Sequence, residues 1–319
     1  MSRFGRFAIA LLCAMSANHA AAQNFPTRPV TIIVPNAPAG LMDVIGRLLQ
    51  TPLQALWKQP VVVDYKPGAG TAVGTAYTAK AAPDGYTICV VATPHVINPA
   101  MQKLSFDTIK DLSGITMIGV SSSIITATPS LPANTLAEAI ALVRKNPGKY
   151  SYASPGVGSS QHLAMELLKQ RAGLDLLHVP FKGSSPAYPE VMSGRVEFLI
   201  DPLFPTLNHV KAGRLKAIAL TGSQRPAVAP DVALIADMFP GFNVSSLFGL
   251  VVASGTPRDV VKKIYADVAT VLRQSETQAK VAELGLEPHP ATPEQFDALI
   301  KSEVERWIEF VRTSKISTE

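Results

Sequence analysis

Histidine, cysteine and serine side chains are the first residues in this sequence that could do acid–base, metal or nucleophilic chemistry. Beyond the N-terminal segment the histidines are His95, His162, His178, His209 and His289. They form no H-E-x-x-H motif and no close pair, and there is no C-x-x-C motif, so the sequence predicts no metal site. The G-x-S-x-G nucleophile elbow is also absent. We therefore predict no catalytic residues, no cofactor and no enzymatic activity.

Four short loops of small and polar residues are the second kind of candidate, because each follows a predicted strand. They are Asn36–Met42, Thr93–His95, Ser154–Ser160 and Lys182–Ser185. Backbone N–H groups in such loops, together with the partial positive charge at a helix N-terminus, favour an anion. The pattern predicts an anion-binding site that is built from the loops of two domains and has no catalytic groups.

Single side chains near these loops each have more than one interpretation. Lys182 either pairs with a ligand carboxylate or is a solvated loop lysine. Asp201 follows a strand and either accepts hydrogen bonds from a ligand or a water, or caps a turn. Ser159 or Ser160 is expected to cap a helix. His178 lies inside an apolar strand and is expected to be a satisfied core residue.

These loops can meet only if parallel strands bring them together. Apolar runs in the sequence predict such strands. Val30–Val34, Val61–Asp64 and Thr87–Ala92 are typical of buried strands. Apolar residues recur at helical spacing between the first two runs, with a kink expected at Pro52. This βαβαβ order predicts a parallel sheet with right-handed crossovers.

A second set of strands follows in the next part of the chain. The strands expected there are Tyr150–Ala153, Leu177–Pro180, Val196–Ile200 and Leu215–Thr221. The extended run Ile115–Thr128 is a strand pair or a crossover into a second domain, and Ser245–Ala253 is a return to the first. The fold class is therefore α/β. Helix caps are expected at Thr135, with Glu138 completing a capping box, and at Thr256.

The glycine-rich segment that begins at Gly68 resembles a dinucleotide-binding loop only superficially. Its spacing is G-x-G-x-x-x-G, and it does not belong to the first βα unit. We predict a packing turn, with no nicotinamide cofactor.

Residues 1–22 indicate a secretory signal peptide, with Arg3 and Arg6 before a short apolar core and a small-residue cleavage site at Ala20-Ala21-Ala22. Its removal lowers the formal net charge from +5 to +3, because two arginines are lost. The mature chain has no block of Lys and Arg, so nucleic acid is not an expected partner. It also keeps a single cysteine, Cys89, which cannot form an internal disulfide. We expect a soluble periplasmic protein.

The mature sequence resembles the Bug or TctC family of extracytoplasmic solute receptors, which serve bacterial tripartite tricarboxylate transporters. The matching residues in the first part are Arg28-Pro29-Val30, Ile33-Val34-Pro35, Gly40, Asp43, Pro67-Gly68-Ala69-Gly70, Ala81-Ala82-Pro83-Asp84-Gly85-Tyr86-Thr87 and Asn98-Pro99. Those that follow are Tyr152-Ala153-Ser154, Gly156, Gly158-Ser159-Ser160, His162-Leu163, His178-Val179-Pro180, Lys182-Gly183-Ser184, Gly194, Lys211-Ala212-Gly213-Arg214-Leu215, Phe248-Gly249-Leu250 and Gly255-Thr256-Pro257. Each fragment is weak alone, but together and in this order they are specific.

The resemblance implies a periplasmic binding protein-like fold of two α/β lobes joined by two interlobe crossings. The lobes would be residues 23–125 with 249–319, and residues 126–248, and they would close on a small carboxylate. Its ligand-binding residues would be Asn36, Ala39, Gly40, Leu41, Met42, Thr93, His95, Ser154, Gly156, Ser159, Ser160, Lys182, Ser184, Asp201 and Phe248. The partners would be the ligand and the membrane subunits of a transporter, and the protein would be a monomer.

One departure from the family pattern lies in the first loop. A Gly-rich run followed by Thr is usual there, whereas this chain has Ala39-Gly40-Leu41-Met42-Asp43. Leu41 and Met42 add apolar bulk, so we expect an aromatic or longer-chain carboxylate rather than citrate or aspartate. Two other functions remain open at this point: ligand presentation to a membrane sensor kinase, and an exported enzyme.

Overall fold

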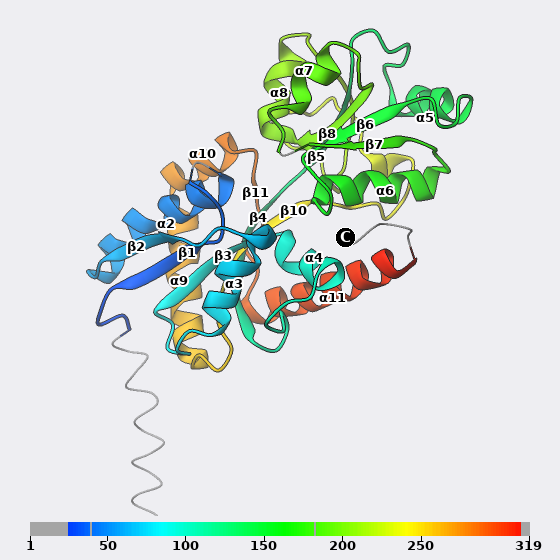
Figure 1. The fold of residues 1–319 in the computed structure, drawn as a ribbon. Helices are drawn as coiled ribbons and strands as arrows, with labels where there is room; N and C mark the ends of the chain where they lie inside the picture. Colours follow the sequence, from blue (N-terminus) through cyan, green and yellow to red (C-terminus); the bar gives the residue numbers. More distant parts are fainter. Residues whose placement is uncertain (1–24, 39, 182, 314–319) are drawn as a thin grey trace, which may run out of the picture. The chain divides into compact units, whose positions relative to one another are not determined.

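The structure is a computed structural model that describes residues 25–38, 40–181 and 183–313 (Figure 1). The described chain divides into two compact units. Unit 1 comprises residues 25–118, 248–278 and 289–313, and unit 2 comprises residues 119–247 and 279–288. The predicted signal peptide lies outside the described residues, and the predicted lobe boundaries stay a prediction.

The elements follow one another in the order β1 (Val30–Val34), α2 (Leu41–Trp57), β2 (Val61–Tyr65), the 3-10 helix η1 (Ala69–Thr71), α3 (Ala72–Ala79), β3 (Thr87–Ala92), α4 (Pro94–Met101), β4 (Leu112–Ser121), β5 (Ser123–Ala127), α5 (Leu136–Arg144), β6 (Ser151–Ser154), α6 (Ser160–Ala172), β7 (Leu177–Pro180), α7 (Ala187–Met192), β8 (Phe198–Pro202), α8 (Leu203–Lys211), β9 (Lys216–Leu220), the 3-10 helix η2 (Ile235–Asp237), β10 (Ser246–Ala253), α9 (Arg258–Leu272), α10 (Ser275–Glu283), β11 (Glu287–Pro288) and α11 (Pro293–Thr313).

The first sheet has the strand order β11-β4-β10-β3-β1-β2. β1 pairs in parallel with β2 and with β3, which confirms the predicted parallel βαβαβ unit. β10 pairs antiparallel with β3, and β11 pairs antiparallel with β4, so the complete sheet is mixed. β10 returns from unit 2, and it separates β3 from β4 although these two strands are consecutive in the sequence.

Helices cover both faces of the sheet in unit 1 (Figure 1). α2 packs on β1 so closely that a Cβ atom at Gly46 would lie 3.0 Å from the Val34 side chain. The indole Nε1–H of Trp57 in α2 donates to Asp267 Oδ2 in α9 at 2.6 Å, which joins these two helices. α11 packs against α4, and its Phe296 side chain lies against Gly249 of β10.

Two helix predictions for unit 1 need correction. The sequence predicted a helix capped by Thr256, but α9 begins at Arg258 with Pro257 as its N-cap, and Thr256 Oγ1 donates to the Ala253 carbonyl. The sequence also placed Thr93–His95 in a loop, whereas α4 begins there at Pro94. Proline is favoured at a first helical position because the N–H that it lacks has no partner there. α2 is assigned as one helix that includes Pro52.

The second sheet has the order β7-β6-β8-β5-β9. β6 is parallel to β7 and β8, while β5 is antiparallel to β8 and β9. Ile124 packs with Leu203 and Leu207 of α8, whereas its neighbour Ile125 faces α5 and α6. Because successive strand residues point to opposite faces, the helices cover both sides of this sheet as well.

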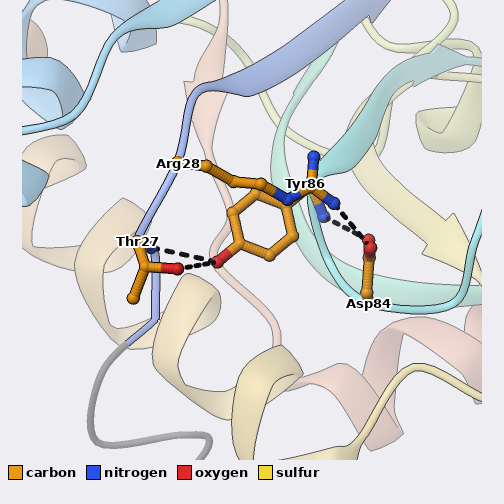
Figure 2. Close-up of polar contacts among 4 residues, drawn as sticks. All are labelled: Thr27, Arg28, Asp84 and Tyr86. Atoms are coloured by element: carbon orange, nitrogen blue, oxygen red, sulfur yellow. Dashed lines mark hydrogen bonds and ion pairs between the residues drawn. The ribbon is translucent and has the colours of Figure 1, made fainter.

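The lead-in to β1 is tied to the turn before β3 (Figure 2). The Thr27 N–H donates to Tyr86 Oη at 3.0 Å, and Arg28 Nη2 donates to Asp84 Oδ2 at 2.7 Å. The Arg28 guanidinium also lies 3.8 Å from the centre of the Tyr86 ring, a cation–π distance. Two of the sequence fragments that match the family, those containing Arg28 and Tyr86, therefore have a structural role: they hold the lead-in to β1 in place.

The glycine-rich segment after β2 is a tight packing turn. Gly68 and Gly70 have φ values of 133° and 56°, which favour glycine. A Cβ atom at Gly74 would lie 2.7 Å from the Pro35 Cβ and 2.9 Å from the Lys66 carbonyl oxygen. These close approaches give a packing reason for the glycine at position 74.

Candidate functional site

The carboxyl ends of β6, β7 and β8 lie at one edge of the second sheet, because the three strands are parallel neighbours. The loops that follow β6 and β7 are joined by backbone hydrogen bonds. The Phe181 N–H donates to the Ser154 carbonyl at 3.0 Å, and the Gly183 N–H donates to the Pro155 carbonyl at 2.9 Å. The predicted residues of unit 2 that the structure describes therefore gather at this edge.

The N-terminus of α6 presents backbone donors at this edge. Ser159 is the N-cap: its Oγ accepts from the His162 N–H at 3.1 Å and donates to the Gly156 carbonyl at 2.7 Å. This confirms the cap expected at Ser159 or Ser160. The N–H groups of Ser160 and Gln161 have no hydrogen-bond acceptor among the residues that the structure describes. Free donors at a helix N-terminus can hold a carboxylate oxygen.

Asp201 lies at the end of β8 and is fully buried. Its Oδ1 accepts from Ser184 Oγ at 2.5 Å, and its Oδ2 accepts from Tyr188 Oη at 2.5 Å and Thr206 Oγ1 at 3.1 Å. Burial raises the pKa of this carboxyl, although the three hydroxyl donors act in the opposite direction. Asp201 thus fixes the Ser184 hydroxyl, a role that neither sequence interpretation included.

A stack of three rings supports the loop after β6. The His178 ring lies 4.7 Å from the Tyr152 ring and 4.2 Å from the His162 ring, with interplanar angles of 16° and 14°. Burial lowers the pKa of His178 to about 4, and the neighbouring His162 contributes in the same direction. His178 is half-buried on the edge strand β7, so the prediction of a core residue is wrong.

Ser154 makes a hydrogen bond to His178, the middle ring of this stack. Its Oγ lies 2.7 Å from His178 Nε2 and accepts from the Gly156 N–H at 3.2 Å. The hydroxyl is buried, as is the whole residue. Ser154 therefore holds the loop in place through His178, and the spacing of the two residues in the sequence gave no sign of this contact.

In unit 1, the loop after β1 lies at the carboxyl ends of β1, β2 and β3. Asn36 is exposed and its Oδ1 accepts from the Ala37 N–H at 2.9 Å. Gly40 is the N-cap of α2, Leu41 is half-buried, and Met42 is buried. Of the two apolar residues that set this chain apart from the family pattern, Leu41 is therefore the one with an accessible side chain.

Thr93 and His95, at the end of β3, are buried. Neither ring nitrogen of His95 has a hydrogen-bond partner among the described residues. Burial lowers the pKa of His95 to about 4, so the ring is neutral near pH 7. Phe248 of β10 is buried too and pairs with Ala92, the last residue of β3. Contact between these residues and a ligand stays a prediction.

Two of the predicted ligand-binding residues, Ala39 and Lys182, lie outside the described residues. Among those described, no group of three or more His, Cys, Asp and Glu side chains is placed to hold a metal ion. No described helix is long and apolar enough to cross a membrane.

The family model described as "Tripartite tricarboxylate transporter family receptor" matches residues 45–316. The chain belongs to this family. Its relatives include a UPF0065 protein from the tcbD-tcbE intergenic region of Pseudomonas sp. (strain P51), which is 34% identical over 89% of this chain and 85% of that protein. Protein BugT of Bordetella pertussis is 32% identical over 91% of the receptor and 90% of its own length.

Solved structures agree with this assignment. The R. palustris protein Rpa4515 with adipate is 29% identical to the receptor, with a TM-score of 0.79, over 92% of this chain and 99% of that one. MatC from Rhodopseudomonas palustris with bound malate is 29% identical, with a TM-score of 0.75, over 90% and 100%. The periplasmic binding protein BugD is 30% identical, with a TM-score of 0.76, over 92% and 99%. The receptor therefore has the periplasmic binding protein-like fold, and its family consists of solute-binding proteins rather than enzymes.

Proposed function

We propose that this receptor captures a small carboxylate in the periplasm, as a monomer and without catalysis, and delivers it to the membrane components of a tripartite tricarboxylate transporter. The observation that carries the proposal is the pair of N–H groups of Ser160 and Gln161 at the start of α6, for which the described part of the chain offers no acceptor. Two relatives that cover nearly the whole chain hold adipate and malate, which supports a carboxylate as the bound anion.

The proposed ligand-binding groups come from both units. In unit 2 they are the α6 N-terminus and the Ser184 hydroxyl, which Asp201 orients. In unit 1 they are the loop from Asn36 to Leu41 and the end of β3. We propose that the units act as lobes that close on the ligand, and that Lys182 pairs with a carboxylate.

Leu41 is the proposed determinant of ligand class. It is half-buried at the start of α2, where the family pattern has small and hydroxyl residues. An apolar side chain there favours a ligand with an aliphatic or aromatic body, since each buried CH₂ contributes about 0.8 kcal/mol. Met42 is buried in unit 1 and is better placed to fix the helix than to touch a ligand.

Thermal-shift measurements with malate, citrate, adipate and benzoate test this function. We expect adipate or benzoate to raise the melting temperature more than malate or citrate does. Leu41→Thr should weaken the preferred ligand about three- to tenfold by calorimetry, and Leu56→Thr is the matched control because Leu56 is exposed on the same helix. Stabilisation by malate and citrate alone would refute the apolar preference, and no stabilisation by any of the four would refute carboxylate capture.

A further inference from the structure

The loop between β6 and α6 is held by the side chain of His162. The Gly158 N–H donates to His162 Nδ1 at 3.2 Å, and the His162 N–H donates back to Ser159 Oγ at 3.1 Å. This resembles a helix capping box, in which Glu or Gln normally occupies the third helical position, except that the acceptor here receives the N–H of the residue before the N-cap. Here a histidine occupies the third helical position, and histidine can lose its acceptor by binding a proton.

The direction of the hydrogen bond from Gly158 fixes the protonation state of the His162 ring. A backbone N–H can only donate, so Nδ1 must be unprotonated. In the imidazolium form Nδ1 also carries a proton, and two donors would then face each other across 3.2 Å. Other hydrogen bonds hold the loop at Pro155 and Gly156, whereas the Val157 side chain next to Gly158 is 55% exposed. Protonation of His162 would therefore release the Gly158 amide.

The titratable groups that face His162 come from two elements. Glu166 and Lys169 lie on α6, and His178 lies on β7, with Tyr152 stacked on His178. The Glu166 charge is already shared, because Tyr152 Oη donates to it at 2.6 Å and Lys169 Nζ donates to it at 2.7 Å. Burial lowers the pKa of His162, as does Lys169, while Glu166 acts against them. The positive end of the α6 dipole also disfavours a cation at this position.

We propose that His162 is a pH-sensitive positioning residue. Its neutral ring holds Gly158, and thereby aims the Ser160 and Gln161 amides at the ligand, while protonation loosens the loop and weakens binding. The link to binding rests on the function proposed above. The positioning of Gly158 does not, because it can be measured without any ligand.

Amide hydrogen exchange of Gly158 in the ligand-free mature chain tests the positioning. The quantity to compare is the protection factor, which corrects for the intrinsic effect of pH on exchange. The wild-type protein should protect Gly158 at pH 7.5 and lose at least tenfold of that protection at pH values well below 6.5. His162→Phe keeps a ring in the stack but has no acceptor, so it should be unprotected at both pH values. His162→Gln restores an acceptor that does not titrate, so it should be protected at both.

Wild-type protection in the Phe variant, or the wild-type loss at low pH in the Gln variant, would overturn the proposal. Circular dichroism shows whether each variant is folded. Affinity for adipate at pH 7.5, and at the acid pH at which wild-type Gly158 has lost its protection, adds the functional measurement: the affinity should fall at least tenfold more in the wild type than in His162→Gln. If adipate does not bind at either pH while Gly158 behaves as expected, the choice of ligand fails and the positioning role stands. Equal losses of affinity in the two proteins would refute the link to binding.

Discussion

The stability of unit 1 should depend on pH through His95. This side chain is 2% exposed in α4, and neither of its ring nitrogens has a partner among the described residues. Burial lowers its pKa from 6.5 to about 4. Between these values the unfolded chain binds a proton that the folded chain does not, so the free energy of unfolding falls as the pH drops from 6.5 and levels off near 4.

The size of this effect follows from the shift. One pH unit corresponds to 1.36 kcal/mol for one proton, and the window is about 2.5 units wide, so His95 should cost about 3 kcal/mol of unfolding free energy between pH 7 and pH 4. His95→Leu removes the titrating group and should reduce the loss by about that amount. Other acid-titrating groups contribute to both proteins alike and cancel in the comparison.

Urea denaturation followed by tryptophan fluorescence is a suitable assay, because both tryptophans of the chain, Trp57 and Trp307, lie in unit 1 with His95. A second variant, His95→Gln, keeps a polar side chain that does not titrate. It should follow the pH profile of His95→Leu while being less stable than it at every pH, since its amide is buried. Parallel pH profiles for the wild type and both variants would refute the reasoning.

Three further substitutions test other parts of the structure. Gly74→Ala should lower the free energy of unfolding by about 1–3 kcal/mol in urea denaturation, because its Cβ would lie 2.7 Å from the Pro35 Cβ. Arg28→Ala should cost less than about 1 kcal/mol by the same assay, since its ion pair with Asp84 is solvent-exposed, and a larger loss would mean that the lead-in matters more than its exposure indicates. Asp201→Asn should lower the melting temperature and weaken carboxylate binding in calorimetry, because an amide cannot accept from all three hydroxyls that the carboxylate holds; unchanged affinity would exclude Asp201 as a positioning residue.

The α/β architecture could be predicted because apolar runs and loop breakers are local signals. The βαβαβ unit, the strands of unit 2 and the cap at Ser159 follow from spacing along the chain. α4 was missed because Pro94 and Pro99 both look like helix breakers in the sequence. Pro94 in fact begins the helix, where its missing N–H costs nothing.

The contacts that hold Ser154 and Ser184 in the candidate site could not be predicted, because each joins residues that are distant in the sequence. Ser154 meets His178 only once β6 and β7 pair, and Asp201 meets Ser184 only once β8 lies beside β6. One signal was available. Ser159 and His162 have the spacing of a capping box, and a histidine at its third helical position could have been recognised as an acceptor.

The position of β10 has a consequence for how the chain is made. This strand lies between β3 and β4, yet it is synthesised more than 120 residues after the end of β4. Until residues near 253 have emerged, β3 keeps an open edge and the first sheet cannot be completed. Domains generally fold as their sequence becomes complete during synthesis. The N-terminal half of this sheet should therefore stay unfolded for most of translation, which is the condition that a chain needs if it is to be threaded through a membrane before it folds.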